Sequence, residues 1–287
     1  MCLADLVTTH SIPASGSFAA DEVLMVDYAD ADDHAIAQVA LNRPDKLNAL
    51  TPQMGPDYAR LLAQLDQDPK VRGIVVTGTG RGFCSGADLS TLGGSIEDLR
   101  AYVQGQSVES LPAIVSTLST PVATAINGPC AGIGFVLAIS ADARFVHPKA
   151  TMSTTFARLG LVAEYGIAWL LPRLIGLPAA TDLLLTGRTI TGIEAEELGL
   201  ARCSEDPVAA AHEWVGSIAA NCAPSSVATM KRQLLAADGQ TLRESVDASL
   251  IDMAAAFESP DLAEALLARH EKRQPRFAGF PPERTSP

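Results

Sequence analysis

Short apolar runs rich in β-branched residues alternate with helical patterns over residues 23–205, and this alternation restricts the fold more than any other feature. The strand-like runs are residues 36–41, 73–77, 122–126 and 143–147. Between the first two, Thr51 is a suitable N-cap, with Pro52 at the first helical position. Apolar side chains then recur at helical spacing, at Met54, Tyr58, Leu61, Leu62 and Leu65. Strands separated by helices predict α/β layers with mostly parallel strands.

The pattern changes near residue 206, beyond which the sequence favours helices alone. Helical segments are predicted over residues 207–221, 225–236, 240–257 and 260–271. Just before them, Thr191 and Glu194 have the spacing of a capping box, which predicts a short helix ending at Gly199. Residues 1–22 have no clear period. We therefore expect a loose N-terminal arm over 1–22, an α/β core over 23–205 and a C-terminal helical region over 206–287.

The charge balance disfavours two classes of partner. The 287 residues are 47% hydrophobic, enough for a sizeable core, and carry a net charge of -12. Such acidity disfavours binding to nucleic acid or to anionic membranes, which depends on clustered Lys and Arg. The first Lys or Arg is Arg43, so no signal or transit peptide is expected, and no apolar stretch approaches the ~18 residues of a membrane span.

The cysteine and histidine patterns indicate neither a disulfide framework nor a metal site. The five cysteines are widely spaced and form no CxxC pair. The five histidines lack HxxxH and HExxH spacing. We expect a reduced cytoplasmic protein without a bound metal.

Two glycine-rich stretches each follow a predicted strand. They are "TGTGRGFCSGADL", residues 77–89, and "INGPCAGIGF", residues 126–135. Their glycine spacing matches neither a phosphate-binding loop nor a nucleophile elbow, and a simple turn remains an alternative for the first stretch. In the second, Pro129 and the glycines predict the start of a helix, whose first amides have no internal acceptor. Two strand exits with free N–H groups predict an oxyanion hole for a carbonyl that becomes negative during reaction.

Four motifs in order carry a resemblance to a known family. They are "LNRPDKLNAL", "GFCSGADL", "INGPCAGIGFVLAISAD" and "GRTITGIEAEELGL". Residues 23–277 resemble the crotonase superfamily of enoyl-CoA hydratases and isomerases. The resemblance implies a spiral of repeated ββα units with a C-terminal helical region that builds trimers, often paired into hexamers. It also implies an acyl-CoA thioester as substrate, with coenzyme A part of that substrate and no separate cofactor.

The resemblance also assigns binding residues. The thioester oxygen would lie between the N–H groups of Ala87 and Ile133, where the family usually has glycine at the second position. The residues placed along the CoA moiety are Lys46, Leu47, Ala49, Asp88, Leu89 and Gly134. Asp88 is alternatively an N-cap of the next helix, and Lys46 a solvated loop charge. Lys272 or Phe277 would meet CoA across a subunit contact or lie in a surface tail.

The acid–base residues depart from the family pattern. The two carboxylates used for hydration map to Val136 and Phe156, which cannot titrate. Glu164 falls where dienoyl-CoA isomerases place an aspartate. Its neighbours in "GLVAEYGIAWLLPRL" are apolar, which predicts a raised pKa suited to proton transfer at neutral pH. Alternatively, Glu164 only complements the dipole of the following helix.

One carboxylate suffices for a proton shuttle, so double-bond isomerisation of an enoyl-CoA is favoured over hydration. Tyr165 and Glu109 are possible helpers, with core packing and a solvated helical face as their alternatives. Cys84 and Cys130 are expected to be small buried side chains rather than nucleophiles. A non-catalytic acyl-CoA-binding homologue and a hydrolase of C–C or thioester bonds remain alternative functions.

Overall fold

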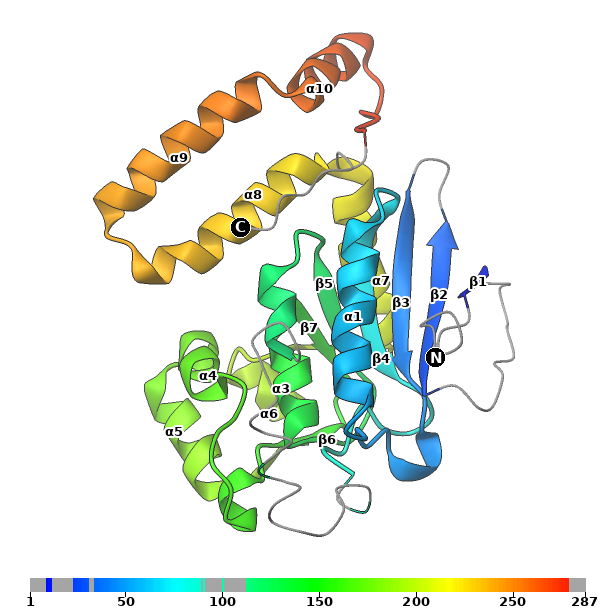
Figure 1. The fold of residues 1–287 in the computed structure, drawn as a ribbon, viewed down its shortest axis with the longest axis vertical. Helices are drawn as coiled ribbons and strands as arrows, with labels where there is room; N and C mark the ends of the chain where they lie inside the picture. The colour runs from blue at the N-terminus through cyan, green and yellow to red at the C-terminus, as the bar shows by residue number, and fades with distance from the viewer. Residues whose placement is uncertain are drawn as a thin grey trace.

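The computed structural model describes residues 9–11, 23–30, 34–88, 90, 100 and 112–278, and it contains two sheets (Figure 1). The larger has the strand order β1-β2-β3-β4-β5-β7-β10, and the smaller has the order β6-β8-β9. In the larger sheet only β2 and β3 pair antiparallel among the described strands. The strands are β1 Thr9–Ser11, β2 Leu24–Asp30, β3 Ala35–Leu41, β4 Val71–Gly78, β5 Val122–Ile126, β6 Cys130–Ala131, β7 Ala143–Val146, β8 Thr151–Ser153, β9 Thr189–Thr191 and β10 Arg202–Cys203. The predicted α/β layering with mostly parallel strands is thus present.

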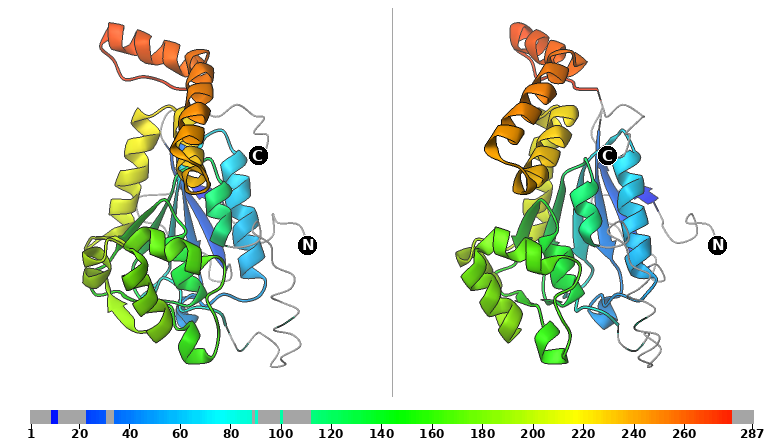
Figure 2. Two further views of the ribbon diagram at one scale, coloured as in Figure 1. Left: turned by 90° about the vertical axis from the view of Figure 1, so that its left-hand side faces the viewer. Right: turned by 60° about the vertical axis from the view of Figure 1, so that its left-hand side comes forward.

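Helices cover both faces of the larger sheet. In the two views of Figure 2, α1 and α3 lie on one face and α7 on the other. The α-helices are α1 Met54–Gln67, α3 Ile133–Ile139, α4 Ile167–Ile175, α5 Leu177–Thr186, α6 Gly192–Glu197, α7 Pro207–Asn221, α8 Pro224–Ala236, α9 Leu242–Phe257 and α10 Pro260–Glu271. Short 3₁₀ turns span η2 Pro44–Lys46, η4 Pro112–Thr117, η5 Phe156–Leu159 and η6 Ala237–Gly239. Every described helix is too short or too polar to cross a lipid bilayer.

Strand β4 shows why the core forms around the centre of this sheet. All its residues are buried, and successive side chains point to opposite faces. Ile74 and Val76 enter the main core, to which α1 and α3 contribute, while Val75 packs with Val215 of α7. An uninterrupted apolar run is what a strand covered on both sides requires, so the sequence pattern follows from the layered fold.

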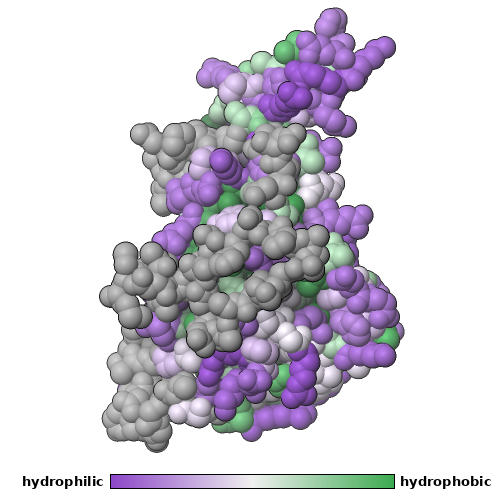
Figure 3. All heavy atoms as spheres, turned by 90° about the vertical axis from the view of Figure 1, so that its right-hand side faces the viewer, coloured by the Kyte–Doolittle hydropathy of each residue, from purple (hydrophilic) through white to green (hydrophobic). Residues whose placement is uncertain are grey.

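The C-terminal helices α8, α9 and α10 extend beyond one end of the sheet (Figure 1). Lys231 ties α8 to the core, because its Nζ lies 2.6 Å from an Asp142 carboxylate oxygen and 2.9 Å from the Thr120 carbonyl. Helix α9 has no buried residue. Figure 3 shows hydrophilic and hydrophobic side chains mixed at this end of the molecule.

The chain returns to the core after α10. Phe277 is only 7% exposed, and its carbonyl accepts a hydrogen bond of 2.5 Å from buried Arg72. The expectation of a surface tail is therefore wrong for Phe277. Lys272 ends α10 in a left-handed conformation and is exposed.

Two predicted helix starts are wrong and one is partly right. Helix α1 begins at Met54, not at Pro52; the Thr51 hydroxyl accepts from the Met54 amide at 3.3 Å within a turn that precedes the helix. Helix α3 begins at Ile133 rather than Pro129, because residues 130–131 pair with β8 first. Thr191 does cap α6 by accepting from the Glu194 amide, but the Glu194 carboxylate pairs with Arg188 at 2.6 Å.

Within the predicted N-terminal arm, the structure describes only Thr9–Ser11, which pairs parallel with β2. The rest of residues 1–22 lies outside the described residues, so the loose arm stays a prediction. The four C-terminal helices lie within three residues of their predicted ranges.

We predict that Gly134→Ala destabilises the protein by about 3 kcal/mol. A Cβ at position 134 would lie 2.3 Å from the Cys84 carbonyl oxygen, and backbone atoms of the core cannot move away cheaply. Thermal unfolding should show a melting temperature lower by about 6–12 °C. Gly239→Ala is the matched control, because its Cβ would meet nothing within 4 Å. Equal stability of the two variants would contradict this packing.

Candidate active site

The two predicted strand exits meet at one edge of the sheet. Strands β4 and β5 are parallel neighbours, so the chain leaves both at the same edge. There, Cys84 and Cys130 form a parallel bridge. The Cys84 amide donates to the Pro129 carbonyl at 3.1 Å, and the Ala131 amide donates to the Cys84 carbonyl at 2.9 Å. The cysteines are 0% and 1% exposed, which confirms that they are small buried side chains.

Glycine is needed on both sides of this junction. Gly86 has a φ of 111° and Gly132 a φ of 55° with ψ of -125°, conformations that residues with a Cβ rarely adopt. The Cα atom of Gly86 lies beside Gly132, since a Cβ on Gly132 would come within 3.8 Å of it. The small residues therefore let two backbones approach closely, as the composition of both stretches predicts.

The Ala87 amide is left free by its neighbours. Ala87 bridges Leu50 in parallel, through bonds of 2.8 Å from the Leu50 amide to the Gly86 carbonyl and from the Asp88 amide to the Leu50 carbonyl. In a parallel bridge of this kind, the groups of the middle residue point away from the partner. Among the described residues, the Ala87 N–H has no acceptor, and Ala87 is exposed.

The Ile133 amide is free for a different reason. Ile133 is the first residue of α3, and the first amides of a helix have no intrahelical acceptor. No acceptor for this amide is found in the described part of the chain. The partial positive charge of the helix N-terminus adds to its attraction for an anion. The Ile133 side chain is 5% exposed and packs in the main core.

A polar loop, residues 43–50, supports the first exit. Asn48 is fully buried with a φ of 57°. Its Oδ1 accepts from the Arg43 amide at 2.8 Å, and its Nδ2 donates to the Thr79 and Gly82 carbonyls at 3.0 and 2.8 Å. These bonds hold the loop and the exit of β4 together. Arg43 and Asn48 lie in the motif "LNRPDKLNAL", but no role for either was predicted from the sequence.

Of the residues that the family resemblance places along CoA, Lys46, Leu47 and Ala49 lie in the loop of residues 43–50, and Gly134 lies in α3. Lys46 is exposed, and its carbonyl accepts from the Ser85 hydroxyl at 3.2 Å; Leu47 is half-buried, and its carbonyl accepts from the Ser85 amide at 2.9 Å. Ala49 is 9% exposed. Gly134 is buried against Cys84. Leu89 lies outside the described residues, and the CoA-binding roles stay predictions.

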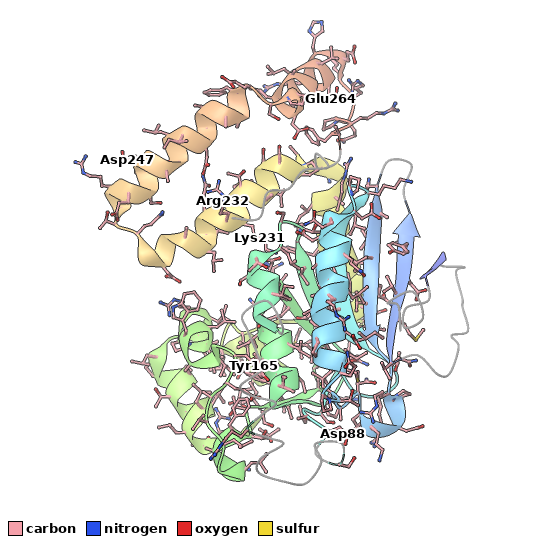
Figure 4. All side chains as sticks on the ribbon, in the orientation of Figure 1. Asp88, Tyr165, Lys231, Arg232, Asp247 and Glu264 are labelled. Atoms are coloured by element: carbon pink, nitrogen blue, oxygen red, sulfur yellow. The ribbon has the colours of Figure 1, made fainter. Side chains whose placement is uncertain are left out.

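Asp88 is engaged on both sides of its carboxylate. One oxygen lies 2.7 Å from Nη2 of Arg43, and the other accepts from the amide and hydroxyl of Ser90. Hydrogen bonds from Ser90 and then Arg43 hold the pKa of this carboxyl below its ordinary value. Figure 4 labels Asp88 and Tyr165 in the half of the molecule away from α8–α10.

Of the positions considered for proton transfer, Glu164 holds a carboxylate, whereas the two hydration positions are apolar. Val136, in the first turn of α3, is 0% exposed, and Phe156, which opens η5, is 4% exposed; neither can titrate. Glu164 lies in the turn before α4 and is half-buried. Burial disfavours its charged form and raises its pKa to about 7, as its apolar neighbours predicted. Tyr165 is half-buried against the main core, and Glu109 lies outside the described residues.

Comparison with known proteins identifies the family. The sequence model of the Enoyl-CoA hydratase/isomerase family matches residues 31–280. The chain belongs to this family. A Thermus thermophilus protein whose name places it among the enoyl-CoA hydratases is 36% identical over 247 residues, which cover 84% of this chain and 97% of that one. The peroxisomal Δ(3,5)-Δ(2,4)-dienoyl-CoA isomerase of Arabidopsis thaliana is 32% identical, covering 86% and 94%.

Solved structures of this family have the same fold as this chain. A crystal structure of an enoyl-CoA hydratase from Bacillus anthracis superposes with a TM-score of 0.83 at 29% identity, covering 90% of this chain and 100% of that one. The predicted crotonase-like α/β fold with C-terminal helices is confirmed. The protein is an acyl-CoA enzyme of the enoyl-CoA hydratase/isomerase family.

We predict a pH signature for Glu164 in stability measurements. Its folded-state pKa of about 7 lies above the ordinary value of 4.5, so the unfolded chain ionises first as pH rises. Wild type should therefore lose stability relative to Glu164→Gln progressively between pH 4.5 and 7, with no further divergence above. Chemical unfolding across pH 4–8 measures this difference. A flat difference between wild type and Glu164→Gln across this pH range would contradict the raised pKa.

Proposed function

We propose that this enzyme isomerises the double bond of an enoyl-CoA through a thioester enolate, with Glu164 as the single proton shuttle. The observation that carries the proposal is the combination of one carboxylate of pKa about 7 with apolar residues at Val136 and Phe156. A carboxylate with a pKa near neutrality is suited both to accept and to return a proton. By its resemblance to the family, hydration would use two carboxylates, and both of those positions, Val136 and Phe156, are apolar here.

The free amides of Ala87 and Ile133 would stabilise the enolate. Charge accumulates on the thioester oxygen when a proton leaves the α carbon, and two aimed N–H groups offset that charge. One such donor typically contributes about 3 kcal/mol to transition-state stabilisation. Both amides belong to backbone that is held by the Cys84–Cys130 junction, so they need little reorganisation during reaction.

Glu164 alone can carry out both proton transfers of this isomerisation. Glu164 takes a proton from the α carbon of a 3-enoyl thioester, and the electron pair moves onto the carbonyl oxygen to give a dienolate. The protonated Glu164 next delivers the same proton to the γ carbon, and the electrons return to form the conjugated 2-enoyl thioester. Neither water nor an oxidant is consumed. A dienoyl-CoA would react by the same shuttle over a longer conjugated system.

The similarity to the plant dienoyl-CoA isomerase supports this choice, while the similarity to enoyl-CoA hydratases supports hydration as the second candidate. Hydration needs Glu164 to activate water and another group to supply the acid. A binding protein without turnover, or a hydrolase of thioester or C–C bonds, would use the same oxyanion site. A cytoplasmic location stays a prediction.

Absorbance assays on three substrates test the proposal. With 3-enoyl-CoA the purified enzyme should raise the absorbance of the conjugated thioester, and 3,5-dienoyl-CoA should also react. Crotonyl-CoA should lose absorbance slowly or not at all. Glu164→Gln should lower kcat by at least about 10²-fold, the lower limit for a general acid–base group, with CoA-thioester affinity little changed. Unchanged turnover in this variant rules out the base assignment, and rapid loss of the crotonyl-CoA signal would favour hydration instead.

We also propose that the protein self-associates into a homotrimer or hexamer through the C-terminal helices. Their large apolar side chains are exposed, as at Leu234 (78%), Ile251 (73%) and Phe257 (68%). Exposed apolar surface of this kind commonly marks a protein interface. Light scattering should give three or six times the chain mass for wild type and a lower multiple for Ile251→Asp. Asp247→Asn on the same helix is the control, and a monomeric wild type would contradict the proposal.

A further inference from the structure

Arg43 joins two chain segments that flank the free Ala87 amide. Its Nη1 donates to the Ala49 carbonyl, and its Nη2 donates to the Asp88 carboxylate at 2.7 Å. Ala49 precedes Leu50, the residue that bridges Ala87, and Asp88 follows Ala87 directly. One guanidinium therefore spans the two chains next to the amide that the proposed reaction uses.

The direction of the Ala87 N–H depends on how these segments are held. The carbonyl of Gly86 and the amide of Asp88 both bond to Leu50, each at 2.8 Å. The peptide between Gly86 and Ala87 carries both the bonded carbonyl and the free N–H, so a rotation of this peptide breaks the first as it redirects the second. Two hydrogen bonds alone restrain this peptide weakly. The Arg43 side chain beside the bridge restrains it further and limits such rotation.

We propose that Arg43 is a positioning residue that, through Asp88 and the Ala49 carbonyl, fixes the direction of the Ala87 N–H in the oxyanion hole. The inference rests on the proposed function, because it assigns to Arg43 a part in stabilising the thioester enolate. Arg43 does not itself touch the reacting atoms.

The competing role for Arg43 is direct attraction of the CoA phosphates. Its geometry argues against this role, since the Arg43 side chain is 19% exposed and its charge is already matched by a carboxylate that is itself 9% exposed. Exposed Lys46, three residues on, has no carboxylate within ion-pair distance among the described residues and is better placed for an anion. A guanidinium bound to two fixed acceptors is typical of a structural clamp.

Chemistry also separates Arg43 from a lysine at the same position. A guanidinium presents several donors in a planar fork, so it reaches a carbonyl and a carboxylate together. An ammonium is a point charge on a flexible stem and would keep the attraction to Asp88 while losing the fixed geometry. Arg43→Lys should therefore retain the charge but recover only part of the rate.

The first test separates chemistry from binding. Arg43→Ala should lower kcat for isomerisation about 10-fold or more, a part of the 10²–10³-fold that a whole oxyanion donor contributes, with KM changed less than about threefold. The same loss should appear with an enoyl-pantetheine thioester, which lacks the nucleotide phosphates. Asp88→Asn should reproduce the loss, and the double variant should be no worse than the worse single variant, because both remove one clamp.

The second test measures the oxyanion hole without turnover. A 3-oxoacyl-CoA absorbs differently as its enolate, so the enolate fraction of the bound ligand reports donor alignment at a given pH. Arg43→Ala should bind this ligand but show a smaller enolate fraction, with Arg43→Lys between Arg43→Ala and wild type. Arg60→Ala is the matched control, because it removes the guanidinium paired with buried Asp57 on α1 and leaves residues 86–88 untouched.

The outcomes are distinguishable. An Arg43→Ala variant that keeps its kcat and enolate fraction in an active enzyme overturns the positioning role and leaves the proposed function standing. A loss confined to KM, and absent with the pantetheine thioester, assigns Arg43 to phosphate binding and also overturns it. A wild type that neither isomerises any thioester nor binds the enolate removes the proposed function, and the role of Arg43 with it.

Discussion

The close contact between the exits of β4 and β5 is the constraint on which the rest of the site depends. Parallel neighbours in a sheet bring their carboxyl ends together, but side chains normally keep the following loops apart. Here the Cys84–Cys130 bridge draws the loops into backbone contact, and glycines on both sides make that contact possible. Helix α3 then begins directly behind the bridge, so its first amides lie near the free Ala87 amide.

A second set of contacts fixes the outer edge of this junction. Buried Asn48 satisfies its polar groups on three backbone positions, and Arg43 clamps the same loop to Asp88. Buried polar groups that are fully hydrogen-bonded specify a unique arrangement, whereas a half-satisfied set would destabilise it. The loop of residues 43–50 therefore holds the exit of β4 in place, and the core packed against α3 holds the exit of β5 in place.

The sequence predicted those features that depend on local pattern. The β-branched runs located β3, β4, β5 and β7, and small residues after two parallel strands predicted that their exits would meet. Apolar neighbours predicted the raised pKa of Glu164 in the correct direction. Features that depend on contacts between residues far apart in the sequence could not be predicted from local pattern. Asn48 bonds to residues more than 30 positions away, and Phe277 is buried by a contact with Arg72, 205 positions distant.

The proposed base, Glu164, belongs to a different part of the fold from this junction, and the separation has a chemical consequence. Glu164 lies in the turn before α4, whose far end is held by Arg173 stacking on Trp169 at 3.9 Å and pairing with Asp238 at 2.6 Å. The proposed oxyanion site is thus made of backbone from one part of the fold, and the proposed proton-transfer group is a side chain from another. Because side chains change by single substitutions while backbone junctions do not, an enolate site can be kept while the acid–base residue moves. Valine and phenylalanine in place of two carboxylates, with Glu164 present, fit that division of roles.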